Sequence, residues 1–402
     1  MVHESPNHPE YDEQAPVLKP YVAVERSETT LLAERNPYFP LVDIEGNQLP
    51  YIDKLRVNLA EEKEMMNMKM TTGEATFAGV HTKSTDIPLY ENNKEKGDYQ
   101  VNVWNSGRGS ALSLMPNLTH KDEKIREIFQ NLRFRKAISL AIDRKDINKK
   151  VFYEMATPRQ ATTLPISEYF KPEFAEAYAE LDQEKARKLL DEIGMEDNDD
   201  DGYRERPDGE PFKITLTYNE HEGPRTNILE MVKSDLQEVG INIELKMISQ
   251  SLKIQRWGSN DFDMGEWHID RVMDLVTPIM LTKTFAPTWP SYEDWTSPWP
   301  AWIHWYNSED GEEGMEPPEK VKEIIKYAEE FRFATDIETR NEAGTKIMEA
   351  QAENLWTIGT VGLTPWPVLT SNKLKNIPKK GFWTDDLQRF VPFYPSQFYL
   401  EE

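Results

Sequence analysis

The chain has 402 residues, which is enough for two or three compact units with a large core. Asp and Glu total 71 against 47 Lys and Arg, and the resulting net charge of −24 argues against nucleic acid and anionic lipid as partners. The sequence has no cysteine, which excludes disulfides, thiolate nucleophiles and cysteine-based metal sites.

The amino terminus is polar and rich in proline, and we expect an extended segment over residues 1–20. Residues 1–14, MVHESPNHPEYDEQ, lack the basic flank and the apolar core of a secretory signal peptide. No apolar run in the chain approaches the roughly 18 residues that a membrane-spanning helix needs.

The segment ERNPYFPLVDIEGNQLPYID, residues 34–53, lies between stretches of alternating apolar residues. Val22 and Val24 precede it, and Leu55 and Val57 follow it. Two prolines, a Gly-Asn pair and three aromatic side chains interrupt the segment itself. This pattern predicts two strands joined by a long, ordered loop.

The next part of the chain predicts a mixture of helices and strands. Residues 61–72 indicate a helix whose methionines we interpret as core filler. Residues 72–80 predict a strand, and residues 100–115 predict two strands around a Gly-Arg-Gly turn. Helical apolar spacing over residues 121–153 predicts helices, with Arg144 in water.

The central part of the chain favours an α/β fold. Residues 212–248 read as strand, helix and strand, which is typical of a right-handed crossover between parallel strands. Residues 317–353 predict two helices, the second opened by a capping box of Thr335 and Glu338. The apolar residues 355–363 predict a buried strand.

Two segments carry a family resemblance: residues 34–53, and RFRKAISLAIDRKDI at residues 133–147. Both resemble the family 5 extracytoplasmic solute-binding proteins of ABC importers, which take up oligopeptides, nickel and some oligosaccharides. The resemblance runs from about Tyr21 to the carboxyl terminus. It implies an α/β, two-lobe periplasmic-binding-protein-like fold of type II, which closes on a ligand and is not an enzyme.

The resemblance also implies a domain organisation and a location. After the amino-terminal segment it places a partial first lobe at residues 21–84, a second α/β lobe at 85–358 and a return to the first lobe at 359–402. Because the segment at 34–53 normally lies well inside such chains, we expect that an amino-terminal section is missing. Family members work outside the cytoplasm, in the periplasm or on the cell surface.

Residues 263–274, DMGEWHIDRVMD, resemble the family segment in which a Trp and an Asp follow a core strand into the ligand cleft. The resemblance implies that Asp270 binds the amino terminus of a peptide ligand and that Trp267 forms an adjacent wall. In the alternative, Asp270 pairs with Arg271 or caps a helix. His268 is interpreted as a hydrogen-bonded structural residue.

Trp104 and Arg108 lie near the expected passage between the lobes, and both are ligand-binding candidates. Arg108 can bind a ligand carboxylate through both arms of its guanidinium, and the alternative is an exposed arginine in a turn. Five tryptophans between residues 289 and 305 form an aromatic belt without periodicity, which indicates a structured loop. Indole faces suit sugars and peptide side chains, and Trp289 is the ligand-binding candidate of the belt. In the alternative, most of the five tryptophans are buried and hold the loop in place.

The acidic loop DNDDDGYRERPD, residues 197–208, matches part of a calcium-binding pattern. Asp197, Asp199, Asp201 and Asp208 fall at positions 1, 3, 5 and 12 of such a loop. The acid at position 12 is shorter than the usual Glu, and a predicted strand follows it. Two interpretations stay open: a structural calcium ion that staples the loop, and an acidic turn without metal. No other cofactor is predicted.

The sequence contains no phosphate-binding glycine loop, no zinc-protease or serine-hydrolase motif and no dinucleotide fingerprint. We therefore predict a monomeric substrate-binding protein that captures an oligopeptide between two lobes for an ABC permease. One alternative is an oligosaccharide-binding transport protein of the same family. Another is a carbohydrate-active hydrolase, suggested by the many Trp and acidic residues. A third is a remnant that is too incomplete to close on a ligand.

Overall fold

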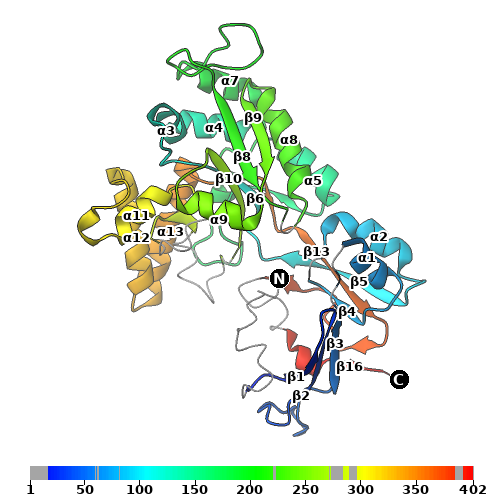
Figure 1. The fold of residues 1–402 in the computed structure, drawn as a ribbon. Coiled ribbons are helices and arrows are strands. Elements are labelled where there is room, and N and C mark those ends of the chain that lie inside the picture. Colours follow the sequence, from blue (N-terminus) through cyan, green and yellow to red (C-terminus); the bar gives the residue numbers. More distant parts are fainter. Residues whose placement is uncertain are drawn as a thin grey trace.

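The computed structural model describes residues 17–58, 60, 63–80, 82–220, 223–270, 272, 284–288, 297–384 and 393–401. Its helices and sheets gather into an upper body around a five-stranded sheet and a lower body around a four-stranded and a three-stranded sheet (Figure 1). The predicted α/β character is confirmed.

The three-stranded sheet has the order β1-β2-β3 and is antiparallel. Its strands are β1 (Tyr21–Arg26), β2 (Thr30–Arg35) and β3 (Lys54–Asn58). The loop between β2 and β3 is ordered as predicted, because the Gln48 amide donates to the carbonyl oxygen of Pro37 at 2.7 Å and the Tyr51 hydroxyl donates to Asp43 at 2.7 Å.

The four-stranded sheet has the order β15-β5-β13-β4. It consists of β4 (Phe77–Ala78), β5 (Tyr99–Ser106), β13 (Pro365–Ser371) and β15 (Phe382–Trp383). Beside it lie α1 (Lys63–Thr71), η2 (Ser84–Asp86) and α2 (Ile87–Asn93), and β14 (Leu374–Lys375) pairs with β16 (Tyr399–Leu400). Its core includes Trp104, Trp366 and Trp383, with the last two rings stacked at 3.7 Å between centroids.

The five-stranded sheet of the upper body has the order β11-β6-β10-β8-β9. It consists of β6 (Ser110–Pro116), β8 (Lys213–Tyr218), β9 (Asn242–Met247), β10 (Met264–Ile269) and β11 (Ile358–Gly359). β8 and β9 are parallel and are joined through α8 (Arg225–Gln237), which confirms the predicted strand-helix-strand unit. β10 is parallel to β8 and antiparallel to β6.

Helices cover this sheet and form a group to its side (Figure 1). The α-helices of this body among the described residues, besides α8, are α3 (Glu123–Gln130), α4 (Leu132–Ala141), α5 (Arg144–Phe152), α6 (Pro172–Glu176), α7 (Gln183–Asp191), α9 (Gln250–Gly258), α11 (Pro300–Asn307), α12 (Glu319–Phe333) and α13 (Ile337–Asn354). Asp143 caps α5 and Asp182 caps α7, because each carboxylate accepts a backbone N–H from the first turn of its helix.

Three local predictions are wrong. Arg144 is buried, because its guanidinium donates to the carbonyl oxygens of Ser139 and Gly359 inside the upper body. Asp336 caps α13 in place of Thr335, since its carboxylate accepts the Thr339 N–H at 2.7 Å.

The third concerns the aromatic belt. Its described part is not a loop, because Pro300 opens α11 and supplies a favourable first helical residue. Trp299 and Trp302 are buried in the main core, as the packing interpretation predicts.

The chain passes between the two bodies at two adjacent places. β5 belongs to the lower body and β6 to the upper, so residues 107–109 are a passage between sheets and not a hairpin turn. The return runs from β12 (Val361–Gly362), which pairs with β7 (Thr157–Pro158), to β13. The two passages are hydrogen-bonded to each other, from the Leu363 N–H to the Arg108 carbonyl at 3.0 Å and from the Ser106 N–H to the Thr364 carbonyl at 2.9 Å. The predicted lobe limits at residues 84 and 358 remain predictions.

Candidate functional site

The candidate ligand-binding residues of β10 lie beside the passage between the bodies. The Gly109 N–H donates to the carbonyl oxygen of Ile269 at 2.8 Å, which holds the end of β10 against the first passage. A Cβ on Gly109 would lie 2.0 Å from the Thr162 carbonyl oxygen, so only glycine allows this approach. Arg108 and Asp270 are thereby brought to the same end of the sheet.

Trp267 packs within a group of charged side chains. Its ring is stacked on His268 at 4.6 Å between centroids, and the Arg225 guanidinium and the Lys253 ammonium lie 4.7 and 4.8 Å from its centroid. Cations over an indole face are attracted by the ring's electron density. Trp267 is 9% exposed, so little of it remains open to a ligand in this conformation.

A buried ionic network lies behind Trp267, and sequence reasoning missed it. Glu266, which is fully buried, accepts from Lys253 Nζ at 2.6 Å and from the Arg225 guanidinium. Burial lowers the pKa of Lys253 to about 8, although the charge of Glu266 opposes the shift. The sequence did carry a signal for this network, which is the glutamate inside the apolar strand MGEWHI. A charge that is buried in a sheet requires an oppositely charged partner.

His268 connects this network to Asp270. Its Nδ1 lies 2.9 Å from an Arg225 nitrogen, and its Nε2 lies 3.5 Å from an Asp270 carboxylate oxygen. Burial lowers the pKa of His268 and the charge of Arg108 adds to the effect, so the imidazole is neutral at neutral pH. These contacts agree with the structural interpretation of His268.

Asp270 itself remains partly accessible, with 18% of its side chain exposed. Arg271, the partner that the alternative names, lies outside the described residues. The role of Asp270 as an anchor for a ligand ammonium therefore stays a prediction.

Arg108 and Trp104 have different surroundings. Arg108 is 4% exposed, so the interpretation as an exposed turn arginine is wrong. Its guanidinium lies 5.5 and 5.2 Å from the ring centroids of Trp366 and Trp383, between the two bodies. Trp104 is buried in the lower body and donates its indole N–H to the Pro378 carbonyl at 3.2 Å. Trp289 lies outside the described residues.

A narrow hollow opens at the passage, with about 20 Å³ of space for water. Segments of both bodies line it, including residues 82–84, 223–225 and 364–366 together with Arg108. A larger hollow of about 360 Å³ lies elsewhere, between α3 and the loop after α7, and its charged lining residues are of both signs.

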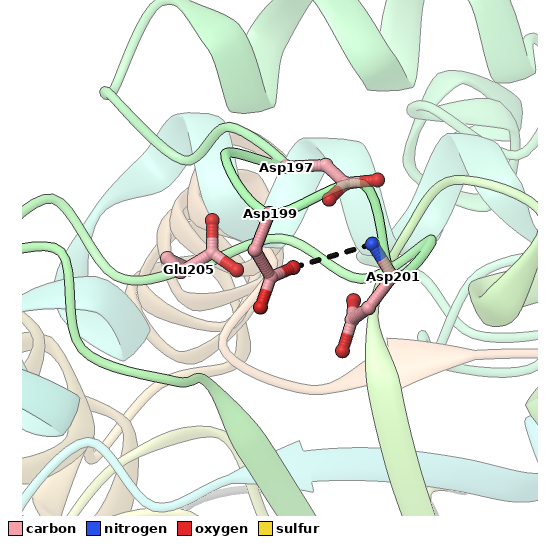
Figure 2. A group of neighbouring side chains, drawn as sticks. All are labelled: Asp197, Asp199, Asp201 and Glu205. Carbon is pink, nitrogen blue, oxygen red and sulfur yellow. Dashed lines mark hydrogen bonds between the residues drawn. The ribbon is translucent and has the colours of Figure 1, made fainter.

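The acidic loop gathers three of the four predicted metal ligands. Carboxylate oxygens of Asp197, Asp199, Asp201 and Glu205 lie within 4.8 Å of one another (Figure 2). Asp208 instead forms two contacts of 3.0 Å with the Arg206 guanidinium, because that cation lies two residues earlier in the same loop.

Glu205 was missed, although it falls at position 9 of the loop, which contributes ligands in calcium-binding loops. Hard carboxylate oxygens suit calcium, yet exposed acidic clusters also occur without metal. The calcium site stays a prediction.

Comparisons with known proteins match this chain to bacterial solute-binding proteins. The family model "Bacterial extracellular solute-binding proteins, family 5 Middle" matches residues 2–284. The periplasmic alpha-galactoside-binding protein of Rhizobium meliloti is 24% identical over 383 residues, which are 90% of this chain and 52% of that protein. The oligopeptide-binding protein AppA of Bacillus subtilis is 25% identical over 137 residues, or 34% of this chain and 25% of that one. The chain thus spans about half the length of the first of these relatives.

Solved structures share the fold. An oligopeptide-binding protein OppA matches with a TM-score of 0.73 and 32% identity, over 97% of this chain and 63% of that chain. The periplasmic binding protein MelB of Agrobacterium fabrum, in complex with stachyose, matches with a TM-score of 0.71 and 20% identity, over 96% of this chain and 57% of that one. These likenesses confirm the predicted periplasmic-binding-protein fold class. Within the described residues, no helix is both long enough and apolar enough to cross a membrane.

Proposed function

Because the chain belongs to the bacterial extracellular solute-binding proteins of family 5, we propose that it captures an oligopeptide between its two bodies and delivers it to the permease of an ABC importer. The family membership confirms the resemblance carried by residues 34–53 and 133–147. Capture would occur by closure about the two passages, because a ligand that contacts both bodies only in the closed state favours that state.

One observation carries the choice of peptide. Asp270 directly follows β10 at the passage, is partly exposed and lies 3.5 Å from His268, where a ligand held between the bodies would meet it. A carboxylate at such a place pairs well with an ammonium group, since charge-assisted hydrogen bonds are strong when partly shielded from water. The 32% identity to a protein named oligopeptide-binding protein supports the same choice.

An oligosaccharide is the second candidate ligand. It is favoured by the alpha-galactoside-binding relative, which matches 90% of this chain, and by the likeness to a protein that holds stachyose. Two belt tryptophans that would suit sugar rings, Trp299 and Trp302, are buried in the core. This burial removes part of the sequence argument for sugar.

The hydrolase alternative has no support among the comparisons, because the relatives reported above are solute-binding proteins. A location outside the cytoplasm, a permease partner and a monomeric state are parts of the proposal. The location and the permease partner follow from the family resemblance.

Thermal-shift measurements test the proposal. A pool of short peptides should raise the melting temperature of the protein, since a ligand at a hundred times its Kd adds about 2.7 kcal/mol of stability. Stachyose and mannohexaose serve as the sugar arm. The substitution Asp270→Asn should weaken peptide affinity about tenfold or more by removing a charge-assisted contact. Asp53→Asn is the matched control, because that side chain is 82% exposed in the lower body.

Three results are distinguishable. A shift with peptides that Asp270→Asn reduces supports the proposal. A shift with sugars alone favours the second candidate. Absence of a shift with either pool contradicts ligand capture and favours the remnant interpretation.

A further inference from the structure

His268 lies at an irregular position near the end of β10. The pairing of β10 with β6 shifts register between Trp267 and Ile269, and irregularities of this kind re-aim side chains. The imidazole of His268 is buried. One of its nitrogens faces a guanidinium inside the upper body, and the other faces the partly exposed carboxylate of Asp270.

The contacts of the imidazole determine which nitrogen carries its proton. His268 Nδ1 lies 2.9 Å from Nη2 of Arg225. A guanidinium has only donors, so Nδ1 accepts this hydrogen bond. Because the imidazole is neutral, its single proton is on Nε2, the nitrogen that lies 3.5 Å from an Asp270 carboxylate oxygen. Hydrogen bonds at functional sites are often long before the ligand binds and shorten in the complex.

Arg225 is itself held in place by the buried network. Its guanidinium donates to the carboxylate of Glu266 and lies 4.7 Å from the centroid of the Trp267 ring. Lys253 donates to the other carboxylate oxygen of Glu266 at 2.6 Å. Buried polar groups that are bonded to one another form a rigid unit. Arg225 therefore presents a fixed donor to His268.

We propose that His268 is a positioning residue that directs its Nε2 proton at Asp270, and that Arg225 fixes this tautomer. A carboxylate held in one orientation loses less conformational entropy when a ligand binds it. The aligned Asp270 then distinguishes a ligand ammonium from a neutral amide more sharply. This selection of an ammonium rests on the proposed function, whereas the tautomer and its contact with Asp270 do not depend on a ligand.

Nitrogen NMR of protein labelled in histidine tests the tautomer without a ligand. The resonances of His268 are identified by their absence from the spectrum of His268→Gln. We expect a neutral ring with its proton on Nε2, and Asp270→Asn should shift the Nε2 resonance more than that of Nδ1, which Arg225 holds. A proton on Nδ1, a charged ring at neutral pH, or an Nε2 resonance that Asp270→Asn leaves in place would overturn the proposal.

Two variants of His268 separate its two hydrogen bonds. The amide of glutamine reaches the position of Nε2 and can donate to Asp270, whereas that of asparagine reaches only the position of Nδ1. Thermal-shift titrations with a pool of short peptides, and with the same pool after amino-terminal acetylation, give the preference for a free ammonium. His268→Asn should reduce this preference about fivefold, and His268→Gln should retain most of it. A loss of packing alone would weaken the binding of both pools equally.

His120→Asn is the matched control and should leave the preference unchanged. His120 also contacts a carboxylate, that of Asp263 at 3.2 Å, and Asp263 directly precedes β10, whereas Asp270 follows it. Melting curves establish that the variants fold. If both His268 variants keep the wild-type preference, the positioning role is overturned. If neither pool shifts the melting temperature of the wild type, the proposed function fails together with the ammonium selection, and the NMR result alone decides the tautomer and its contact.

Discussion

The buried network of Glu266 is the most informative place to perturb this fold. Glu266→Gln keeps the size of the side chain and removes its charge, which leaves Lys253 and Arg225 buried without their shared carboxylate. Breaking a buried ion pair from one side costs about 3–5 kcal/mol, and here one substitution affects two cations. We expect the free energy of unfolding to fall by about that amount.

Urea denaturation followed by tryptophan fluorescence and by circular dichroism measures this change, and agreement between the two probes tests two-state behaviour. Glu244→Gln is the matched control, because Glu244 lies on the neighbouring region of the same sheet and pairs with Lys213 at 2.6 Å on the exposed surface. The control should change stability little, since surface ion pairs contribute little.

A double variant tests whether the stranded cations cause the loss of stability. Lys253→Met combined with Glu266→Gln removes one of the two stranded cations, and methionine retains most of the volume of the lysine stem. The double variant should therefore be more stable than Glu266→Gln alone. If Glu266→Gln lowers the free energy of unfolding no more than Glu244→Gln does, Glu266 is not the shared partner of two buried cations.

Two further predictions concern pH and metal. Burial raises the pKa of Asp235 to about 6, so the folded protein loses stability as the pH rises from the unfolded pKa near 4 to about 6. Asp235→Asn should therefore be more stable than the wild type at pH 7. Urea denaturation at several pH values should show that this difference vanishes below about pH 4. An equal effect of the substitution at both pH values would contradict this cause. If the acidic loop holds calcium, isothermal titration should detect binding that Asp199→Asn combined with Asp201→Asn abolishes, whereas Asp208→Asn should leave it intact, since Asp208 pairs with Arg206. Heat exchange that is equal in all three proteins would exclude the site.

The oligopeptide and oligosaccharide alternatives differ in what they require of the passage between the bodies. A peptide brings an ammonium group, for which Asp270 at the passage is the proposed partner. A neutral sugar would not use this charge.

Much of the architecture could be read along the chain because its signals are local. The strand-helix-strand unit over residues 212–248 combines apolar periodicity with a closing glycine, and its parallel pairing is the common result of such a unit. The loop over residues 34–53 is specified by its own prolines and polar side chains, which bond within it. This loop also carried part of the family resemblance.

The candidate site depended on contacts between distant segments. Glu266 is paired with Lys253 and Arg225, which are 13 and 41 residues away, and no periodicity states which cation meets a buried acid. Arg108 stands between two glycines, as a turn residue would, yet the strands on either side enter different sheets and enclose it. Helical and strand signals extend over a turn or two of chain, whereas burial and charge pairing are set by which surfaces the folded backbone brings together.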